Sequence, residues 1–202
     1  MKDFHAAKSS YEHAKTLLEE LSREDPLNAK IKRDLALSYT GLGVACQKLT
    51  QPEAESFLKK ALELQQELHE LEKNNASGQA ELMHAYARAG FYQQAIEIAR
   101  ELEEKHPENV RILIQVASGY SLSVSAIAHG KTEDELTDDD KKRQEQFGTK
   151  AVAIIRKCIT LGYKSLANLE SNSDLDPIRS RDDFIELLND LKKTKSSIET
   201  SL

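Results

Sequence analysis

The stretch AYARAGFYQQA, residues 85–95, decides the fold that this sequence predicts. An apolar helical pattern leads up to Gly90 and resumes directly after it. Glycine permits a tight turn between two antiparallel helices, and the small side chains of Ala95 and Ala99 let those helices approach closely. Pro107 then ends the second helix, because proline is not tolerated in a helix interior. The stretch therefore predicts a helical hairpin.

Apolar residues at three- and four-residue spacing predict further helices on both sides of this hairpin. We expect helices over residues 3–24, 31–46, 54–71, 112–130, 147–159 and 184–191, with a short helix over 163–169 and a turn over 173–177. Thr50 with Glu53, and Thr137 with Asp140, have the spacing of capping boxes at the starts of the helices that follow.

Composition supports an all-α protein. The 202 residues include only eight glycines and four prolines, which argues against a loop-rich all-β fold. Hydrophobic residues make up 39% and charged ones 31%, enough for one sizeable core or for a stacked, elongated one. The net charge is −6 and no segment is strongly basic, so we expect no nucleic-acid partner.

Location and redox state are predicted from a few segments. The N-terminus lacks the apolar core of a secretory signal, so we expect a cytoplasmic protein. Cys46 and Cys158 lie in apolar helical patterns and are expected to be buried thiols rather than a disulfide. Residues 112–130 carry no charge and approach the ~20 residues that span a bilayer. Their serines, with Gln115 and His129, favour a helix buried between others, and no membrane contact is expected.

The hairpin has the residue pattern of a known repeat. The matching positions are Tyr86, Gly90, Tyr92, Ala95, Ala99, Leu102 and Pro107. In this pattern the chain resembles the tetratricopeptide family. A looser copy precedes it, at Tyr39, Leu42, Gly43, Cys46, Ala54, Leu58 and Ala61. The resemblance implies a superhelical solenoid of antiparallel helix pairs.

Other segments extend the resemblance. Residues 11–39 resemble the extended repeats of large bacterial signalling proteins, and residues 115–122, 159–163 and 174–184 resemble the C-terminal region of bacterial Ser/Thr protein kinases that carry tetratricopeptide repeats. This implies association with such a kinase. The sequence has no Gly-rich loop, His-Arg-Asp or Asp-Phe-Gly motif, so we expect a noncatalytic module without a cofactor.

The family's groove positions can be carried over residue by residue. They fall on Thr40, Val44, Gln47, His84, Arg88, Arg111, Gln115 and Ser118. Such a groove binds an extended peptide or a partner helix. Thr40 and Val44 replace the Lys and Asn of chaperone-binding domains, which argues against a clamp for a chaperone's C-terminal carboxylate. Arg88 and Arg111 could hold an acidic peptide through bidentate hydrogen bonds, or could simply be solvated.

Other groups of residues in the sequence predict no metal, phosphate or calcium site. The six histidines show no i, i+4 pair and no cysteine nearby, so no metal site is expected. Gly41 and Gly43 resemble the start of a phosphate loop but lack the third glycine, and we interpret them as a helix-packing site. The acidic residues within 131–140 lack the ligand spacing of a calcium loop. We expect a mobile, solvated loop there.

The sequence predicts one repeat domain over residues 1–192, with a capping segment over 162–192 and a frayed tail over 193–202. Phe184, Leu187, Leu188 and Leu191 would cover the apolar end of the solenoid or dock a partner. Two other functions stay open. An oligomerisation module would form a homodimer through Phe4, Tyr11, Leu18 and Leu21, and an enzyme would require an active site that no titratable cluster indicates.

Overall fold

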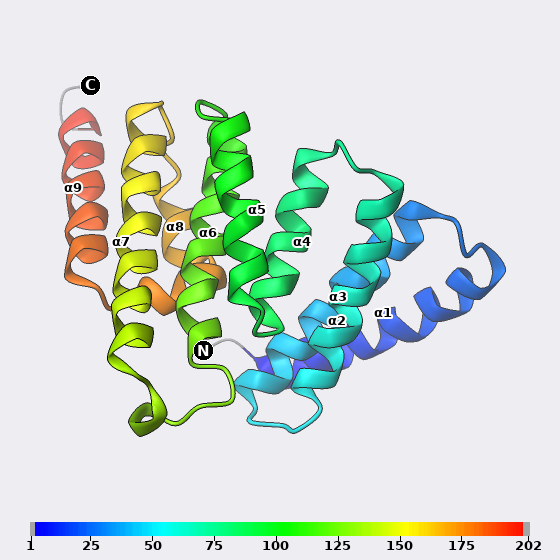
Figure 1. Cartoon of the computed structure of the whole chain (residues 1–202). Helices are drawn as coiled ribbons and strands as arrows, with labels where there is room; N and C mark the ends of the chain where they lie inside the picture. Colours follow the sequence, from blue (N-terminus) through cyan, green and yellow to red (C-terminus); the bar gives the residue numbers. More distant parts are fainter. Residues whose placement is uncertain (1–2, 200–202) are drawn as a thin grey trace. The chain divides into compact units, whose positions relative to one another are not determined.

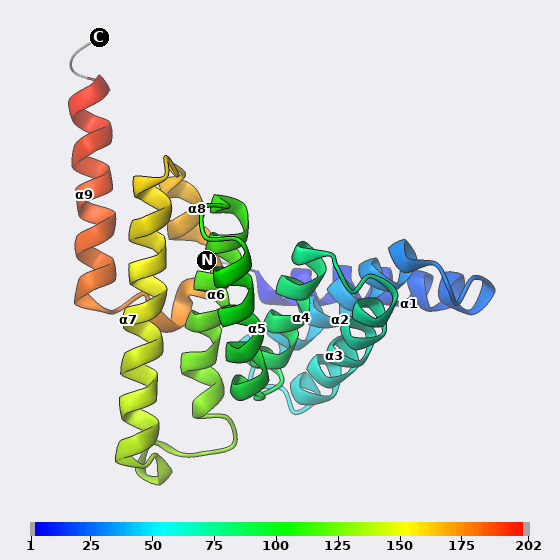
Figure 2. The same cartoon turned by 45° about the horizontal axis from the view of Figure 1, so that its top comes forward.

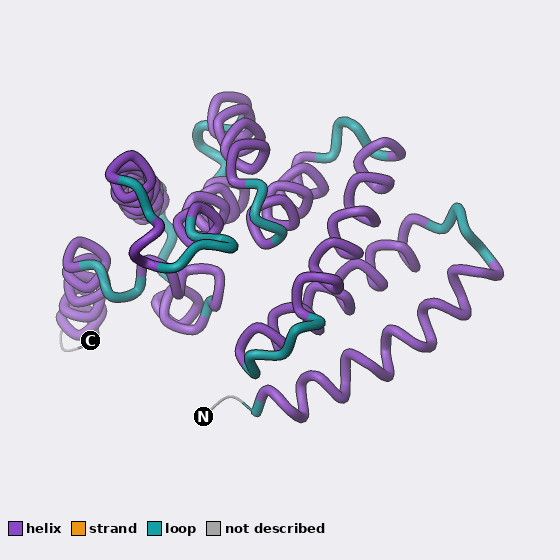
Figure 3. Tube along the Cα trace, turned by 60° about the horizontal axis from the view of Figure 1, so that its bottom comes forward, coloured by secondary structure: helices purple, strands orange, loops and turns teal. Residues whose placement is uncertain are grey.

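The computed structural model describes residues 3–199, with side chains up to Lys193. Every regular element in that range is helical, which confirms the all-α prediction (Figures 1 and 3). The elements are α1 (Phe4–Glu24), α2 (Ala29–Lys48), α3 (Ala54–Leu71), α4 (Ala76–Arg88), α5 (Tyr92–Lys105), α6 (Val110–Ile127), η1 (Glu133–Glu135), α7 (Asp138–Thr160), α8 (Leu166–Ser171), η2 (Ser173–Ile178) and α9 (Asp182–Glu199).

The chain forms two compact units, residues 1–89 and 90–202. The boundary lies at Gly90, inside the stretch that decided the predicted fold. Gly90 has φ +89°, a left-handed conformation that side chains other than glycine's rarely adopt, as the turn between two helices requires. The predicted fray from residue 193 falls on α9, whose backbone is helical to Glu199, and on residues outside the described range.

The first unit contains α1 to α4, with α2 packed between α1 and α3 and with α4 against α3. Asparagine or aspartate side chains start three of these helices, because their oxygens accept hydrogen bonds from backbone N–H groups of the first turn. Asp3 caps α1, Asn28 caps α2 and Asn75 caps α4. The core around α2 includes Leu35 and Tyr39.

Two glycines let α2 approach its neighbours closely. A Cβ atom on Gly41 would lie 2.4 Å from the Tyr11 ring of α1, and one on Gly43 would lie 2.6 Å from Leu58 of α3. Real Cβ atoms do not approach other heavy atoms so closely. A larger residue at Gly41 would therefore push α1 or its Tyr11 ring away, and one at Gly43 would push α3 or its Leu58 side chain away. The interpretation of Gly41 and Gly43 as a packing site is confirmed.

The predicted capping box at Thr50 and Glu53 is wrong. Thr50 has φ +55° and ends α2 instead of starting α3. Its N–H donates to the Gln47 carbonyl at 3.1 Å, and the Gln51 N–H donates to the Cys46 carbonyl at 2.9 Å. These two bonds form a Schellman motif, which satisfies the last carbonyls of a helix. Glu53 caps α3 without a side-chain hydrogen bond.

The second unit contains α5 to α9, with α6 packed between α5 and α7 and covered by η2 (Figure 2). Leu169, Leu175, Ile178, Phe184 and Leu187 are all buried, so the segment after Gly162 supplies core as well as cover. The helix α6 is long and apolar enough to cross a membrane by length and composition alone. In the structure, 61% of this helix is buried.

Residues 131–140 contain η1 and the first turn of α7. Thr132 and Glu135 form a capping box at η1, and Thr137 and Asp140 form the predicted one at α7. The Lys131 ammonium lies 2.7 Å from Asp140 Oδ2. This ion pair and the hydrogen bonds from Thr137 hold the pKa of Asp140 down at about 2.

We expect Gly43→Ala to lower the free energy of unfolding by about 1–3 kcal/mol, because the added methyl group must displace buried Leu58. The matched control is Gly78→Ala in α4, whose Cβ would lie 3.5 Å from the nearest Asn75 atom. Alanine favours helix over glycine by up to about 1 kcal/mol, so the control should be neutral or stabilising. Urea unfolding followed by circular dichroism measures both, and equal stabilities would contradict the close packing.

The lowered pKa of Asp140 predicts a pH dependence of stability. Its carboxylate is more acidic in the folded state than in the unfolded chain, so its contribution is present above about pH 4 and is lost as pH falls toward 2. Asp140→Asn should reduce stability at neutral pH, with the difference from wild type shrinking over that window. Unfolding curves at pH 7, 4 and 2.5 measure the stability of both proteins. A stability difference that does not change with pH would contradict the role of the Asp140 carboxylate in the capping box.

Candidate functional site

The predicted groove residues of α2 lie along one stripe of that helix. Thr40, Val44 and Gln47 follow one another at four- and three-residue spacing, which places them on a single side, and Arg33, which was not among the predicted residues, lies seven residues before Thr40 on the same side. Gln47 is exposed, and Arg33, Thr40 and Val44 are partly buried. Their side chains can therefore reach a molecule in solution.

A second stripe runs along α4 and is joined to the first. Glu81, His84 and Arg88 share one side of α4 at three- and four-residue spacing, and all three are partly buried. Arg33 Nε lies 3.6 Å from Glu81 Oε2, so the two stripes meet within the first unit. We call Thr40, Val44, Gln47, His84 and Arg88 the α2–α4 face.

A charge network fixes the junction of these stripes. Arg33 also donates to Glu72 at 2.7 Å, at the end of α3, and Glu72 accepts from the Asn75 amide at 2.7 Å. The Asn75 amide and then the Arg33 guanidinium lower the pKa of Glu72. Arg33 thus links α2, the end of α3 and α4.

The second unit carries the remaining predicted residues, and one of them is not on the surface. Arg111 is exposed and Gln115 is partly buried. Ser118 is only 2% exposed, and its Oγ accepts a hydrogen bond of 3.2 Å from the Asn172 amide. The prediction that Ser118 lines an open groove is wrong, because the chain returns over α6 between α8 and η2.

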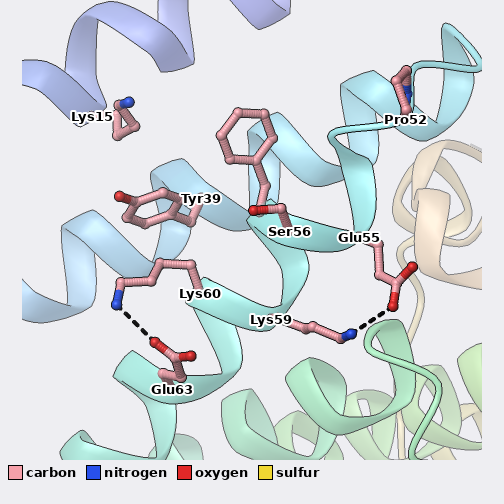
Figure 4. Close-up of a pocket in the computed structure, with 9 residues that line it drawn as sticks. Lys15, Tyr39, Pro52, Glu55, Ser56, Lys59, Lys60 and Glu63 are labelled. Carbon is pink, nitrogen blue, oxygen red and sulfur yellow. Dashed lines mark hydrogen bonds and ion pairs between the residues drawn. The ribbon is translucent and has the colours of Figure 1, made fainter.

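A hollow of the first unit opens between α1 and α3, with α2 at its floor (Figure 4). Its volume is about 660 Å³. The Tyr39 and Phe57 rings, 6.2 Å apart between centroids, supply its aromatic wall. The lining residues are Lys15, Tyr39, Pro52, Glu55, Ser56, Phe57, Lys59, Lys60 and Glu63.

The charges around this hollow are largely neutralised. Lys59 pairs with Glu55 at 2.6 Å and Lys60 with Glu63 at 2.7 Å, as the dashed lines in Figure 4 show. Tyr39 donates its hydroxyl to the Glu19 carboxylate. Burial and then this carboxylate raise the pKa of Tyr39, so its hydroxyl stays protonated at neutral pH. The hollow therefore offers apolar and hydrogen-bonding contacts rather than a reactive group.

Two smaller hollows have different surroundings. One of about 520 Å³ between α3 and α4 is lined by Glu63, Gln66, Glu67, His69, Glu70, Leu82 and Tyr86. One of about 590 Å³ in the second unit is lined by Arg100, Glu103, Glu104, Pro107, Tyr120, Gln146, Phe147, Lys150 and Lys157. Among the described residues, no group of three or more His, Cys, Asp or Glu side chains could hold a metal ion.

Sequence reasoning missed the most exposed apolar residue of α2. Leu37 is 61% exposed, whereas Leu35 and Leu42 on the same helix are 5% and 0% exposed. Leu37 does not share the helical spacing of Leu35, Tyr39 and Leu42. This difference in spacing could have predicted that Leu37 is exposed. The hollow at Tyr39 gave no such signal, because its walls come from three helices.

No family model matches the chain, and no curated protein matches it.

The different burial of Gln47 and Ser118 predicts different thiol reactivity. In Gln47→Cys the new thiol should react with a disulfide reagent about as fast as in the unfolded chain. In Ser118→Cys it should react at least about a hundredfold more slowly, because reaction requires local opening. The buried Cys46 and Cys158 give a low background in the unmodified chain. Equal rates for the two variants would contradict the finding that the segment around Asn172 covers Ser118.

Proposed function

We propose that this chain is a noncatalytic protein-interaction module that binds a peptide or a partner helix on the α2–α4 face. The ion pair between Arg33 and Glu81 carries the proposal, because it joins two stripes of accessible side chains from different helices. Helix pairs that present such stripes bind extended or helical ligands.

The chemistry of the α2–α4 face defines the ligand that fits it. Val44 offers an apolar contact, and Thr40 and Gln47 offer hydrogen bonds. Arg88 and His84 add groups that interact well with carboxylates. The one acidic residue of α2, Asp34, lies on another side of the helix, about 120° from Thr40. A peptide or helix with apolar and acidic side chains therefore fits this face.

We also propose that the helices belong to a tetratricopeptide-like solenoid. The packing of α2 against α3 and the glycine turn at Gly90 support this. Helices α4 and α5, with 13 and 14 residues, end and begin on either side of Gly90. Residues 115–122 and 174–184 extend the proposal to signalling proteins that carry Ser/Thr kinase domains, with the chain acting beside the kinase.

Selection from a displayed peptide library tests the proposal. Peptides enriched on the wild-type chain should bind it in a fluorescence-anisotropy titration. Val44→Glu combined with Thr40→Glu should weaken binding at least about tenfold, because it places two negative charges on the face that would bind acidic side chains. Enriched peptides should be rich in acidic residues.

Lys59→Ala is the matched control, since Lys59 is exposed and lines the hollow between α1 and α3. It should leave peptide affinity unchanged, and both variants should keep the wild-type helix content. Equal binding by the α2–α4 variant and wild type would contradict the proposal. Loss of binding in Lys59→Ala would move the site to the hollow.

A further inference from the structure

Three leucines of the first unit are exposed on neighbouring helices. Leu17 and Leu21, one turn apart on α1, are 57% and 45% exposed, and Leu37 on α2 is 61% exposed. The two helices pack against each other. Single exposed leucines are ordinary on a protein surface, but a contiguous group marks an interaction site. The contacts of α1 and α2 place these three leucines together.

Leu17 and Leu37 lie at the same level of the helix pair. Leu18 packs against the core cluster that contains Leu35 and Tyr39. Leu17 directly precedes Leu18, and Leu37 lies midway between Leu35 and Tyr39 in the sequence. The two exposed leucines are therefore separated by no more than about one helical turn along the pair.

The three leucines also share one side of the helix pair, the side away from α3. Residues two positions apart on a helix point about 200° apart. Leu37 is two positions from Tyr39, whose ring contacts an aromatic ring of α3. Leu17 is two positions from Lys15, which lines the hollow shared with α3, and Leu21 follows Leu17 by one turn. We call these three leucines the leucine patch.

The leucine patch differs from the surface that the sequence predicted for a homodimer, and it shares only Leu21 with that surface. Tyr11 lies over Gly41, and Leu18 packs against the core around α2. Phe4 is partly buried. Tyr11 and Leu18 are thus used for packing within the unit, so the predicted set is wrong for these two residues.

Carboxylates border the leucine patch. Glu20 and Glu24 follow the two leucines of α1 by three residues each, and Asp34 precedes Leu37 by three residues, so each lies about 60° from a leucine around its helix. All three side chains are exposed. Within the described part of the chain, none of them forms an ion pair. Their charges therefore remain available to a partner.

The cations near the patch do not balance these carboxylates. His13 and Lys30 lie on the same sides of α1 and α2 as the leucines. Arg33 is already bound by one carboxylate at the end of α3 and by one on α4. Arg23 is two positions from Leu21 and points to the other side of α1. The border of the patch is therefore negative at neutral pH.

We propose that the leucine patch binds a helix of another protein whose apolar stripe is flanked by Lys or Arg. The apolar stripe packs on Leu17, Leu21 and Leu37, as an amphipathic helix packs into an apolar groove. The flanking cations reach the Glu20 and Glu24 carboxylates, and charge-assisted hydrogen bonds fix the orientation of the helix. Apolar contact and charge complementarity thus define the same partner.

The border charge argues against two other occupants. A second copy of the chain would bring identical carboxylates together across a two-fold axis, where they repel one another. An anionic lipid surface would repel them as well. The proposal is separate from the α2–α4 face, which is expected to bind acidic side chains, so either proposal can fail without the other.

Two designed peptides test the proposal in fluorescence-anisotropy titrations with the full chain. Both are amphipathic helices of about 18 residues, or five turns, with leucines along one side. Lysines flank the leucines in one peptide, and glutamates flank them in the other. The wild-type chain should bind the lysine peptide at least about tenfold more tightly. Equal affinities, or no binding of the lysine peptide, would overturn the proposal.

A pair of leucine substitutions tests the apolar contact. Leu17→Ser combined with Leu37→Ser should weaken binding of the lysine peptide at least about tenfold, because it removes apolar surface from the patch. The matched control is Ile185→Ser on α9, where Ile185 is 43% exposed. It should leave the affinity unchanged, and circular dichroism should show wild-type helix content in both variants. Equal affinities for the leucine variant and the control would place the peptide elsewhere and overturn the proposal.

A pair of charge reversals tests the border. Glu20→Lys combined with Glu24→Lys should abolish the preference for the lysine peptide. Glu97→Lys combined with Glu104→Lys, on exposed residues of α5, changes the net charge equally and should keep the preference. Equal loss in both variants would show that overall charge attracts the peptide, and this overturns the proposal. Self-association of the wild-type chain through the leucines, without peptide binding, also overturns it.

Discussion

The close approach of α2 to its two neighbours is the constraint on which the first unit depends. Gly41 leaves room for the Tyr11 ring, and Gly43 leaves room for Leu58. Because the two glycines are two residues apart, they point toward different helices. This lets α2 lie between α1 and α3, with Leu35, Ala36 and Leu42 in the core.

That central position determines which surfaces remain for binding. The sides of α2 toward α1 and α3 are used by packing, so Thr40, Val44 and Gln47 occupy the side that remains. Arg33 then ties this side to α4 through Glu81. In the second unit, α6 also lies between two helices, but its remaining side is covered near Ser118. Asn172 donates a hydrogen bond to Ser118, and the segment around η2 packs against the helix. One helical architecture thus gives an accessible face in one unit and a covered one in the other.

The sequence predicted features that depend on local spacing. The helices, the turn at Gly90, the packing role of Gly41 and Gly43, and the cap formed by Thr137 and Asp140 all follow from residues near one another in the chain. The cap predicted at Thr50 was wrong because the same residues that can start a helix can also follow a Schellman motif. The backbone conformation of Thr50, rather than its spacing from Glu53, decides between the two.

Features that depend on distant segments were not predictable in the same way. The burial of Ser118 requires a contact with Asn172, 54 residues later, and no local pattern records it. The lining of the hollow at Tyr39 comes from α1, α2 and α3. The exposure of Leu37 could have been predicted, because Leu37 does not share the spacing of the buried residues of α2. The candidate face was therefore predicted in the first unit more completely than in the second.

Hydroxyl-radical footprinting of the dilute full chain, read out by mass spectrometry, tests the arrangement of α2 most directly. Leu35, Leu37 and Leu42 lie on one helix and have the same intrinsic reactivity, while their exposed fractions are 5%, 61% and 0%. The account predicts that Leu37 is oxidised several times faster than Leu35 and Leu42. Similar oxidation rates for all three leucines would contradict the placement of α2 between α1 and α3, and with it the α2–α4 face.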